Sequence, residues 1–228
     1  MSKALSITKI NLRQIKPAYF ITALIFLLMF TNEIISMIIV SSADNEILSS
    51  GNTFILLPVF AAIFIPSRNL RKLINLGGKR NDYFKGCLPV YVILSAFVTL
   101  IIILYYYTVD RLMMNYVHGV INLIEVFGFI RRGPIVAFIQ MFFFLFLFSV
   151  FIHTLTAAQD KWYGWAADIA LVAIISVFTP IAPLRKTLVW FFTAIIFHPN
   201  ALFQIAFCLI LALALYTLNK PILARKII

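Results

Sequence analysis

Long apolar runs separated by short polar segments make up most of this chain. Five of them approach the roughly 20 residues that a helix needs to cross a bilayer core, and a sixth is shorter. We predict spans at residues 18–40, 53–66, 86–107, 134–155, 165–180 and 200–219. By its length alone, the second run could instead be a re-entrant segment, and Pro66 ends it.

The composition supports a lipid environment. Of the 228 residues, 63% are hydrophobic and 12% are charged, whereas a soluble domain carries about 25% charged residues. The first run covers 23 positions, which is too long for a signal-peptide core of roughly 7–15 residues, so we expect it to be retained. The sequence predicts an all-α membrane protein with a single transmembrane domain over residues 1–228.

The basic residues predict the orientation of the spans. With six spans and a cytoplasmic N-terminus, 14 Lys and Arg residues lie inside and five lie outside, as the positive-inside rule requires. The loop 67–85 holds six of these Lys and Arg residues, and it would lie outside if the second span were absent. We therefore expect a multi-pass plasma-membrane protein with both termini in the cytoplasm. The net charge of +11 does not indicate nucleic-acid binding, because the basic residues alternate with spans and form no single solvated face.

Two segments outside the spans have helical periodicity. Before the first span, apolar positions recur beside basic ones, which predicts an N-terminal elbow helix in the cytoplasmic interface; a frayed basic tail is the alternative. Between spans three and four, apolar positions step by four and three residues over 113–129, which predicts an amphipathic outer helix. That helix could pack on the surface or gate an outward opening. Segment 181–199 is expected to be an external excursion with a half-inserted piece.

The loop 67–85 contains the most distinctive pattern. Residues 68–74 predict one or two amphipathic helical turns, and Gly77 and Gly78 then break the helix. Residues 79–85 predict a second short helix that presents Tyr83 and Phe84 to a partner, surrounded by Lys and Arg. Aromatic and Arg side chains often dominate binding energy at interfaces.

This loop resembles a motif of a transporter family. Residues 76–86, Leu-Gly-Gly-Lys-Arg-Asn-Asp-Tyr-Phe-Lys-Gly, are similar to the pattern L-G-x-[ST]-R-x-D-[FY]-F-x-G of small type-2 ABC exporter permeases of Gram-positive bacteria, which export lantibiotics and phenol-soluble modulins. Lys79 departs from the family's Ser or Thr, a natural helix N-cap. The resemblance implies six spans, an elbow helix, a dimer of permeases, either two copies or a copy with a paralogue, and a coupling helix that docks on a separate ATP-binding subunit. The coupling residues it implies are Gly77, Gly78, Lys79, Arg80, Asn81, Asp82, Tyr83 and Phe84.

Signatures of catalysis and of cofactor binding are missing from the sequence. Gly77-Gly78-Lys79 lacks the spacing of a phosphate-binding loop, so we expect ATP and Mg to be bound by the partner subunit, with no cofactor in this chain. Neither a zinc-protease nor a serine-hydrolase motif occurs. Cys87 and Cys208 have no metal-ligand spacing. We expect no enzyme activity and no metal site in this chain.

Four polar residues in the apolar runs are candidates for a substrate path: Asn32, Glu33, His153 and Asp168. A charged group at such depth costs about 2.5–3.5 kcal/mol, so it usually faces a cavity or a partner. In the alternative interpretation, Glu33 reaches outward and Asp168 reaches inward to water or to a basic neighbour. His153 is more typical of a packing residue.

We therefore expect the permease subunit of an ATP-driven exporter that moves amphipathic peptides, antimicrobials or lipid-like cargo outward. An ion-coupled secondary carrier or channel that uses Glu33 and Asp168 is the first alternative, although the sequence has no repeated halves with matching broken spans. A non-transporting membrane scaffold or immunity protein is the second.

Overall fold

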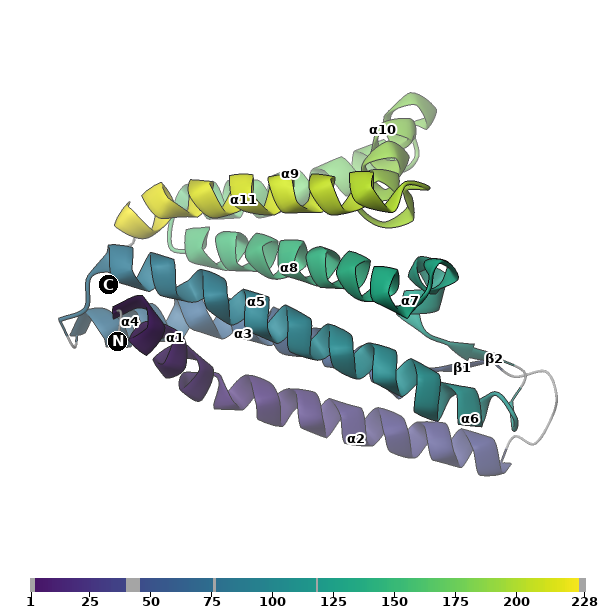
Figure 1. The fold of residues 1–228 in the computed structure, drawn as a ribbon. Helices are drawn as coiled ribbons and strands as arrows, with labels where there is room; N and C mark the ends of the chain where they lie inside the picture. The colour runs from purple at the N-terminus through teal and green to yellow at the C-terminus, as the bar shows by residue number, and fades with distance from the viewer. Residues whose placement is uncertain (1–2, 40–45, 76, 118, 226–228) are drawn as a thin grey trace.

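The computed structural model describes residues 3–39, 46–75, 77–117 and 119–225 of the chain. Long helices lie side by side along one axis (Figure 1). They are α2 (Lys16–Ile39), α5 (Arg80–Tyr105), α8 (Pro134–Ala158), α9 (Trp162–Phe178) and α11 (Ala201–Arg225), and α3 (Leu56–Phe64) is the central part of a further long helical stretch. The shorter helices are α1 (Lys3–Gln14), α4 (Leu70–Asn75), α6 (Arg111–Met113), α7 (Leu123–Val126) and α10 (Ala182–Phe192).

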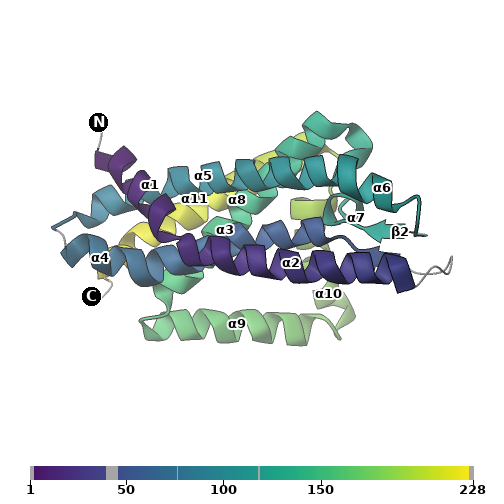
Figure 2. The ribbon, with the colours of Figure 1, turned by 90° about the horizontal axis from the view of Figure 1, so that it is seen from below.

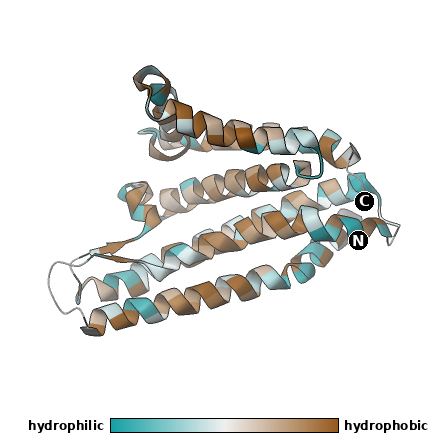
Figure 3. Ribbon diagram, turned by 180° about the vertical axis from the view of Figure 1, so that it is seen from behind, coloured by the Kyte–Doolittle hydropathy of each residue, from teal (hydrophilic) through white to brown (hydrophobic). Residues whose placement is uncertain are grey.

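Five helical stretches in the described part of the chain are long and apolar enough to cross a membrane. They are Lys16–Ile38, Ser50–Asn75, Arg80–Met113, Pro134–Ala158 and Ala201–Leu223. Figure 3 shows hydrophobic positions running along these helices and hydrophilic ones gathered around the end that carries N and C. Since such surfaces are stable only in lipid, the chain is an all-α membrane protein.

The second stretch is longer than its apolar run predicted. A 3-10 turn (Ser50–Ile55) precedes α3, and a π-helical turn (Ile65–Asn69) joins α3 to α4 without interruption. Pro66 lies within this stretch and does not end it, so the prediction that the helix ends at Pro66 is wrong. A π turn accommodates the missing N–H of a proline by widening the helix locally.

The predicted span 165–180 corresponds to α9, which has 17 residues. It runs parallel to the bundle axis and lies apart from α2 and α5 (Figure 2). After α9 the chain bends by 119° into α10, which continues through a π turn to Phe197. The pair is therefore either a broken span or a re-entrant loop.

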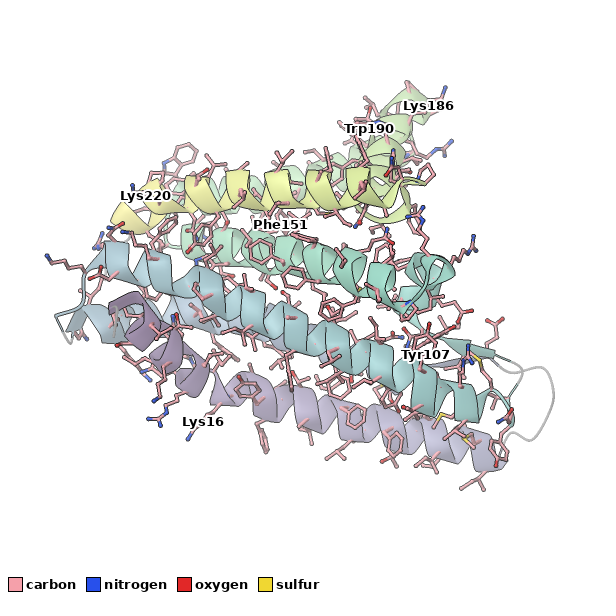
Figure 4. All side chains as sticks on the ribbon, viewed as in Figure 1. Lys16, Tyr107, Phe151, Lys186, Trp190 and Lys220 are labelled. Atoms are coloured by element: carbon pink, nitrogen blue, oxygen red, sulfur yellow. The ribbon has the colours of Figure 1, made fainter. Side chains whose placement is uncertain are left out.

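Both ends of the described chain lie at the same end of the bundle. The first turn of α1 and the last turn of α11 lie at the end of the bundle that carries α4, and we call this the terminal end (Figure 1). The opposite end, where α6, α7 and α10 lie, is called the far end. Figure 4 shows Lys16 and Lys220 toward the terminal end and Lys186 at the tip of the far end.

A helix, α1, precedes the first long helix, and buried polar contacts hold it against α5. The Thr8 hydroxyl donates to the Gly86 carbonyl at 3.1 Å, and the Asn11 amide lies 3.7 Å from the Cys87 sulfur. Asn69 donates to the Asn11 side-chain oxygen at 3.2 Å. These contacts fix α1 to the bundle at the start of α5.

The prediction of one amphipathic helix over 113–129 is wrong. The helix α6 ends at Met113, and strand β2 (Gly119–Ile121) pairs in parallel with β1 (Glu46–Leu48), with Val120 opposite Ile47. The apolar positions are buried, but in two different places. Met113, Val117 and Val120 pack with Ile47, whereas Ile124 belongs to the main core. The spacing of these apolar residues therefore arises because a turn, a strand and a short helix each bury some of them. His118, on the predicted polar face, lies outside the described residues.

Candidate functional site

A helical hairpin made of α4 and the first turns of α5 forms the tip of the terminal end. It turns at Gly77, whose φ of 78° is unfavourable for other residues. The N–H groups of Gly77 and Gly78 donate to the carbonyls of Ile74 and Leu73, at 2.8 and 2.9 Å. A Cβ on Gly78 would lie 2.6 Å from Leu73 Cγ. The predicted glycine break is confirmed.

The second arm of this hairpin differs from the prediction. Residues 79–85 do not form a separate short helix, because α5 starts at Arg80 and continues for 26 residues through the bundle. Lys79 is the N-cap residue, with extended backbone and no side-chain hydrogen bond to the helix. Asp82 lies in the first turn, where a negative charge is favourable. The hairpin is thus continuous with a span.

The prediction that Tyr83 projects toward a partner is wrong. Tyr83 is fully buried, and its hydroxyl donates to the Ile65 carbonyl at 2.7 Å, which ties α5 to the π turn after α3. Phe84 is half-buried and stacks on Tyr216 of α11 with ring centroids 4.3 Å apart. The Tyr216 hydroxyl also donates to the Phe84 carbonyl. Both aromatics therefore anchor the hairpin inside the bundle.

The exposed part of the hairpin is basic and polar. We call it the hairpin basic surface, and it consists of Arg71, Lys72, Asn75, Lys79, Asn81 and Lys85, all exposed. Arg80 lies beside this surface, half-buried, and donates to the Leu223 carbonyl of α11 at 3.2 Å. Of the predicted coupling residues, Gly77, Lys79 and Asn81 are thus exposed, and Gly78 and Asp82 are half-buried.

A second polar arrangement, which we call the far-end polar cluster, lies at the opposite end of the bundle. It consists of Glu33, Ser49, Ser50, Tyr105, Asp110 and Asn122. Asp110 is fully buried and accepts hydrogen bonds from the Ser49 hydroxyl at 2.8 Å and from the Asn122 amide at 2.6 Å. The Asn122 side-chain oxygen accepts from the Ile124 N–H at 3.0 Å and caps α7. Three distant segments therefore meet at one carboxylate.

Glu33 adjoins this arrangement and is also buried. Its Oε2 accepts from the Ser50 N–H at 3.3 Å, and the Tyr105 hydroxyl, 3.5 Å away, shares a 2.6 Å hydrogen bond with the Ser50 hydroxyl. Its Oε1 has no hydrogen-bond partner among the described residues. Glu33 therefore faces the protein interior, and the alternative in which it reaches outward to water is wrong.

The four predicted path residues are not brought together. Asn32 is exposed, although it adjoins Glu33 in sequence. His153 is buried and shares a hydrogen bond through Nδ1 with the Tyr91 hydroxyl. Asp168 is half-buried on α9 and accepts from the Gln159 amide. No single path through these residues follows from their positions.

Sequence reasoning missed Ser49, Asp110 and Asn122. Asp110 follows the apolar run 86–107 by three residues, and a carboxylate so close to a span end was the one available signal. Within the described residues, no group of three or more His, Cys, Asp or Glu side chains could hold a metal ion. Cys87 and Cys208 are buried free thiols.

Comparison with known proteins adds no relative. No protein-family model matches the chain, and neither a curated protein nor a solved structure matches it.

Exchanging the side chains of Asp110 and Asn122 tests the far-end polar cluster. Asn122→Asp should lower the free energy of unfolding by about 1–3 kcal/mol, because it removes a donor and places two carboxyl groups together. Adding Asp110→Asn should recover part of this loss, since an amide again faces a carboxylate. Thermal unfolding in detergent measures both variants. A double variant less stable than Asn122→Asp would contradict the assignment.

Removing the Tyr83 hydroxyl tests the hairpin anchor. Tyr83→Phe should cost about 1 kcal/mol, because the Ile65 carbonyl loses its donor while packing is kept. Tyr116→Phe is the matched control, since its side chain is 71% exposed. Unfolding midpoints in the same detergent give the comparison, and equal midpoints for the two variants would rule out the anchor.

Proposed function

We propose that this chain is the permease subunit of an ATP-driven membrane exporter, with its hairpin basic surface docked on a separate ATP-hydrolysing subunit. The observation that carries the proposal is the hairpin itself. It exposes a cluster of cations at the terminal end and is continuous with α5. The resemblance of residues 76–86 to the coupling motif of type-2 exporter permeases supports the same assignment.

Six crossings fit this proposal. The helix α9 runs along the bundle axis and contacts α8, which supports counting it as the sixth crossing (Figures 1 and 2). An even number of crossings returns the chain to its starting side, in agreement with the shared position of the two chain ends. The excess of Lys and Arg near that end favours the cytoplasmic side.

The hairpin contacts provide a route for movement. Tyr83 connects the tip to the second stretch through Ile65, and Arg80 and Phe84 connect it to α11. A displacement of Lys79 would therefore move three spans together. A partner that binds differently with and without ATP can shift the bundle only through such fixed contacts.

The cargo and the dimer are inferred from exposed apolar surface. The helices α2 and α9 leave large side chains uncovered, including Phe20, which is 71% exposed, and Ile169, which is 66% exposed. These faces suit lipid, a second permease copy or a paralogue. Amphipathic peptides or lipid-like molecules suit a transmembrane domain with so few charged residues. ATP and Mg would be bound by the partner subunit.

One observation favours an ion-coupled carrier as a second candidate. Glu33 and Asp110 are both buried, and neither forms an ion pair with a described Lys or Arg. Buried carboxylates of this kind often mark ion or proton pathways. Transport that continues without ATP and requires Glu33 would favour this candidate over the exporter.

Charge reversal on the hairpin tests the exporter. Arg71→Glu combined with Lys79→Glu should abolish co-purification with ATP-binding subunits encoded beside the gene and lower ATPase stimulation at least about tenfold. Arg185→Glu combined with Lys186→Glu makes the same charge change at the far end and should leave both unchanged.

Two results would overturn the exporter. The first is a wild-type chain that forms no complex with any such ATP-binding subunit. The second is a hairpin variant that co-purifies and stimulates ATPase activity like its control. Because both substituted pairs are exposed, native folding of the variants is expected and is checked by their unfolding midpoints.

A further inference from the structure

A cavity of about 360 Å³ lies at the far end of the bundle. Its walls come from the segment that leads into α8, from the second turn of α8 and from the segment that joins α10 to α11. The lining residues that matter here are Phe127, Arg131, Arg132, Gln140, Phe197 and His198. This volume is in the range of small-molecule sites.

Gln140 is a buried polar group without a partner. Its side chain is 1% exposed and lines the cavity, and its Oε1 has no hydrogen-bond partner among the described residues. Leaving this acceptor without a donor away from bulk water is unfavourable. A ligand with a hydroxyl group in the cavity would remove this cost, because the hydroxyl can donate to Oε1, while the Gln140 NH₂ group can donate to other oxygen atoms of the ligand.

The two arginines at the cavity differ in their bonding. Arg132 donates to the backbone carbonyls of His198 and Pro199, so it holds the two walls together. Arg131 is exposed, and no described residue pairs with its guanidinium group. None of the described lining residues is acidic. The cavity therefore has an uncompensated positive charge.

The two polar groups of the cavity lie at different depths. Arg131 precedes α8, whereas Gln140 lies six residues after its first residue Pro134, or about 9 Å along the helix. Val126 and Phe197 also line the cavity, and each is 52% exposed, so the cavity reaches the surface of the protein beside apolar side chains. A ligand that fits this arrangement has an anionic head and an apolar tail.

We propose that this cavity binds the headgroup of an anionic phospholipid. Arg131 pairs with the phosphodiester, and a hydroxyl group of the headgroup donates to the Gln140 Oε1. The Gln140 NH₂ group donates to the ester oxygens, and the acyl chains leave over Val126 and Phe197. A zwitterionic headgroup would bind more weakly, since no described acidic residue lines the cavity for its cation. The site is remote from the hairpin basic surface, so this proposal does not depend on the exporter assignment.

Native mass spectrometry of the full chain in detergent tests the site with phosphatidylglycerol and phosphatidylcholine. Arg131→Gln should weaken phosphatidylglycerol binding on the order of tenfold, as expected for loss of a charge-assisted hydrogen bond. Arg185→Gln, the same change at an exposed arginine outside the cavity, should have no such effect. Gln140→Leu should also weaken binding, by about threefold to tenfold, and should not lower stability because it removes an unpaired buried amide.

The proposal is overturned if Arg131→Gln and Gln140→Leu both bind phosphatidylglycerol as tightly as Arg185→Gln does. It is also overturned if wild type binds phosphatidylcholine equally well. Competition distinguishes lipid from free phosphate. Displacement of phosphatidylglycerol by an equal concentration of inorganic phosphate would show a plain anion site, whereas resistance to it supports a lipid site. If Arg131→Gln does not fold, the Gln140→Leu result decides.

Discussion

Inside the hydrocarbon layer no water is available to hydrogen-bond a polar group, so a buried polar atom of this chain is stabilised when it finds a partner within the protein. Several contacts between distant segments follow from this constraint. Tyr83 donates to the Ile65 carbonyl, Asp110 gathers Ser49 and Asn122, and Thr8 donates to the Gly86 carbonyl. Each contact joins helices that apolar packing alone would allow to slide, because lipid tails and Leu side chains are equally apolar.

The same constraint connects structure to the proposed function. At the terminal end, the buried hydroxyl of Tyr83 and the stacked ring of Phe84 hold the hairpin against the bundle, while its cations remain exposed. A partner that pulls on these cations would therefore move α5 as a whole. At the far end, Asp110 fixes β1, β2 and α7 around the exit of the same helix. The helix α5 therefore connects the hairpin basic surface to the far-end polar cluster.

Local pattern was sufficient for most of the fold and insufficient for the sites. The apolar runs predicted the long helices, and the pair Gly77-Gly78 predicted the turn, because both features depend only on nearby residues. Tyr83 was misassigned because residues 79–85 were treated as a separate helix; read as part of α5, Tyr83 falls on one stripe with the buried residues Cys87 and Val90. Segment 113–129 has the period of a helix. Part of it nevertheless forms strand β2, because it pairs with β1, about 70 residues away in sequence. The Asp110 contacts likewise depend on non-local pairing that no local pattern reveals.

The central claim is that the hairpin basic surface and the far end face opposite sides of the membrane, with the hairpin in the cytoplasm. Single cysteines at Lys79 and at Lys186, labelled with a membrane-impermeant maleimide in intact cells and in inverted vesicles, test it most directly. Cys87 and Cys208 are buried and should contribute little background. The account predicts that Lys79→Cys is labelled only in inverted vesicles and Lys186→Cys only in intact cells. Labelling of both from the same side, or of Lys79→Cys in intact cells, would contradict it.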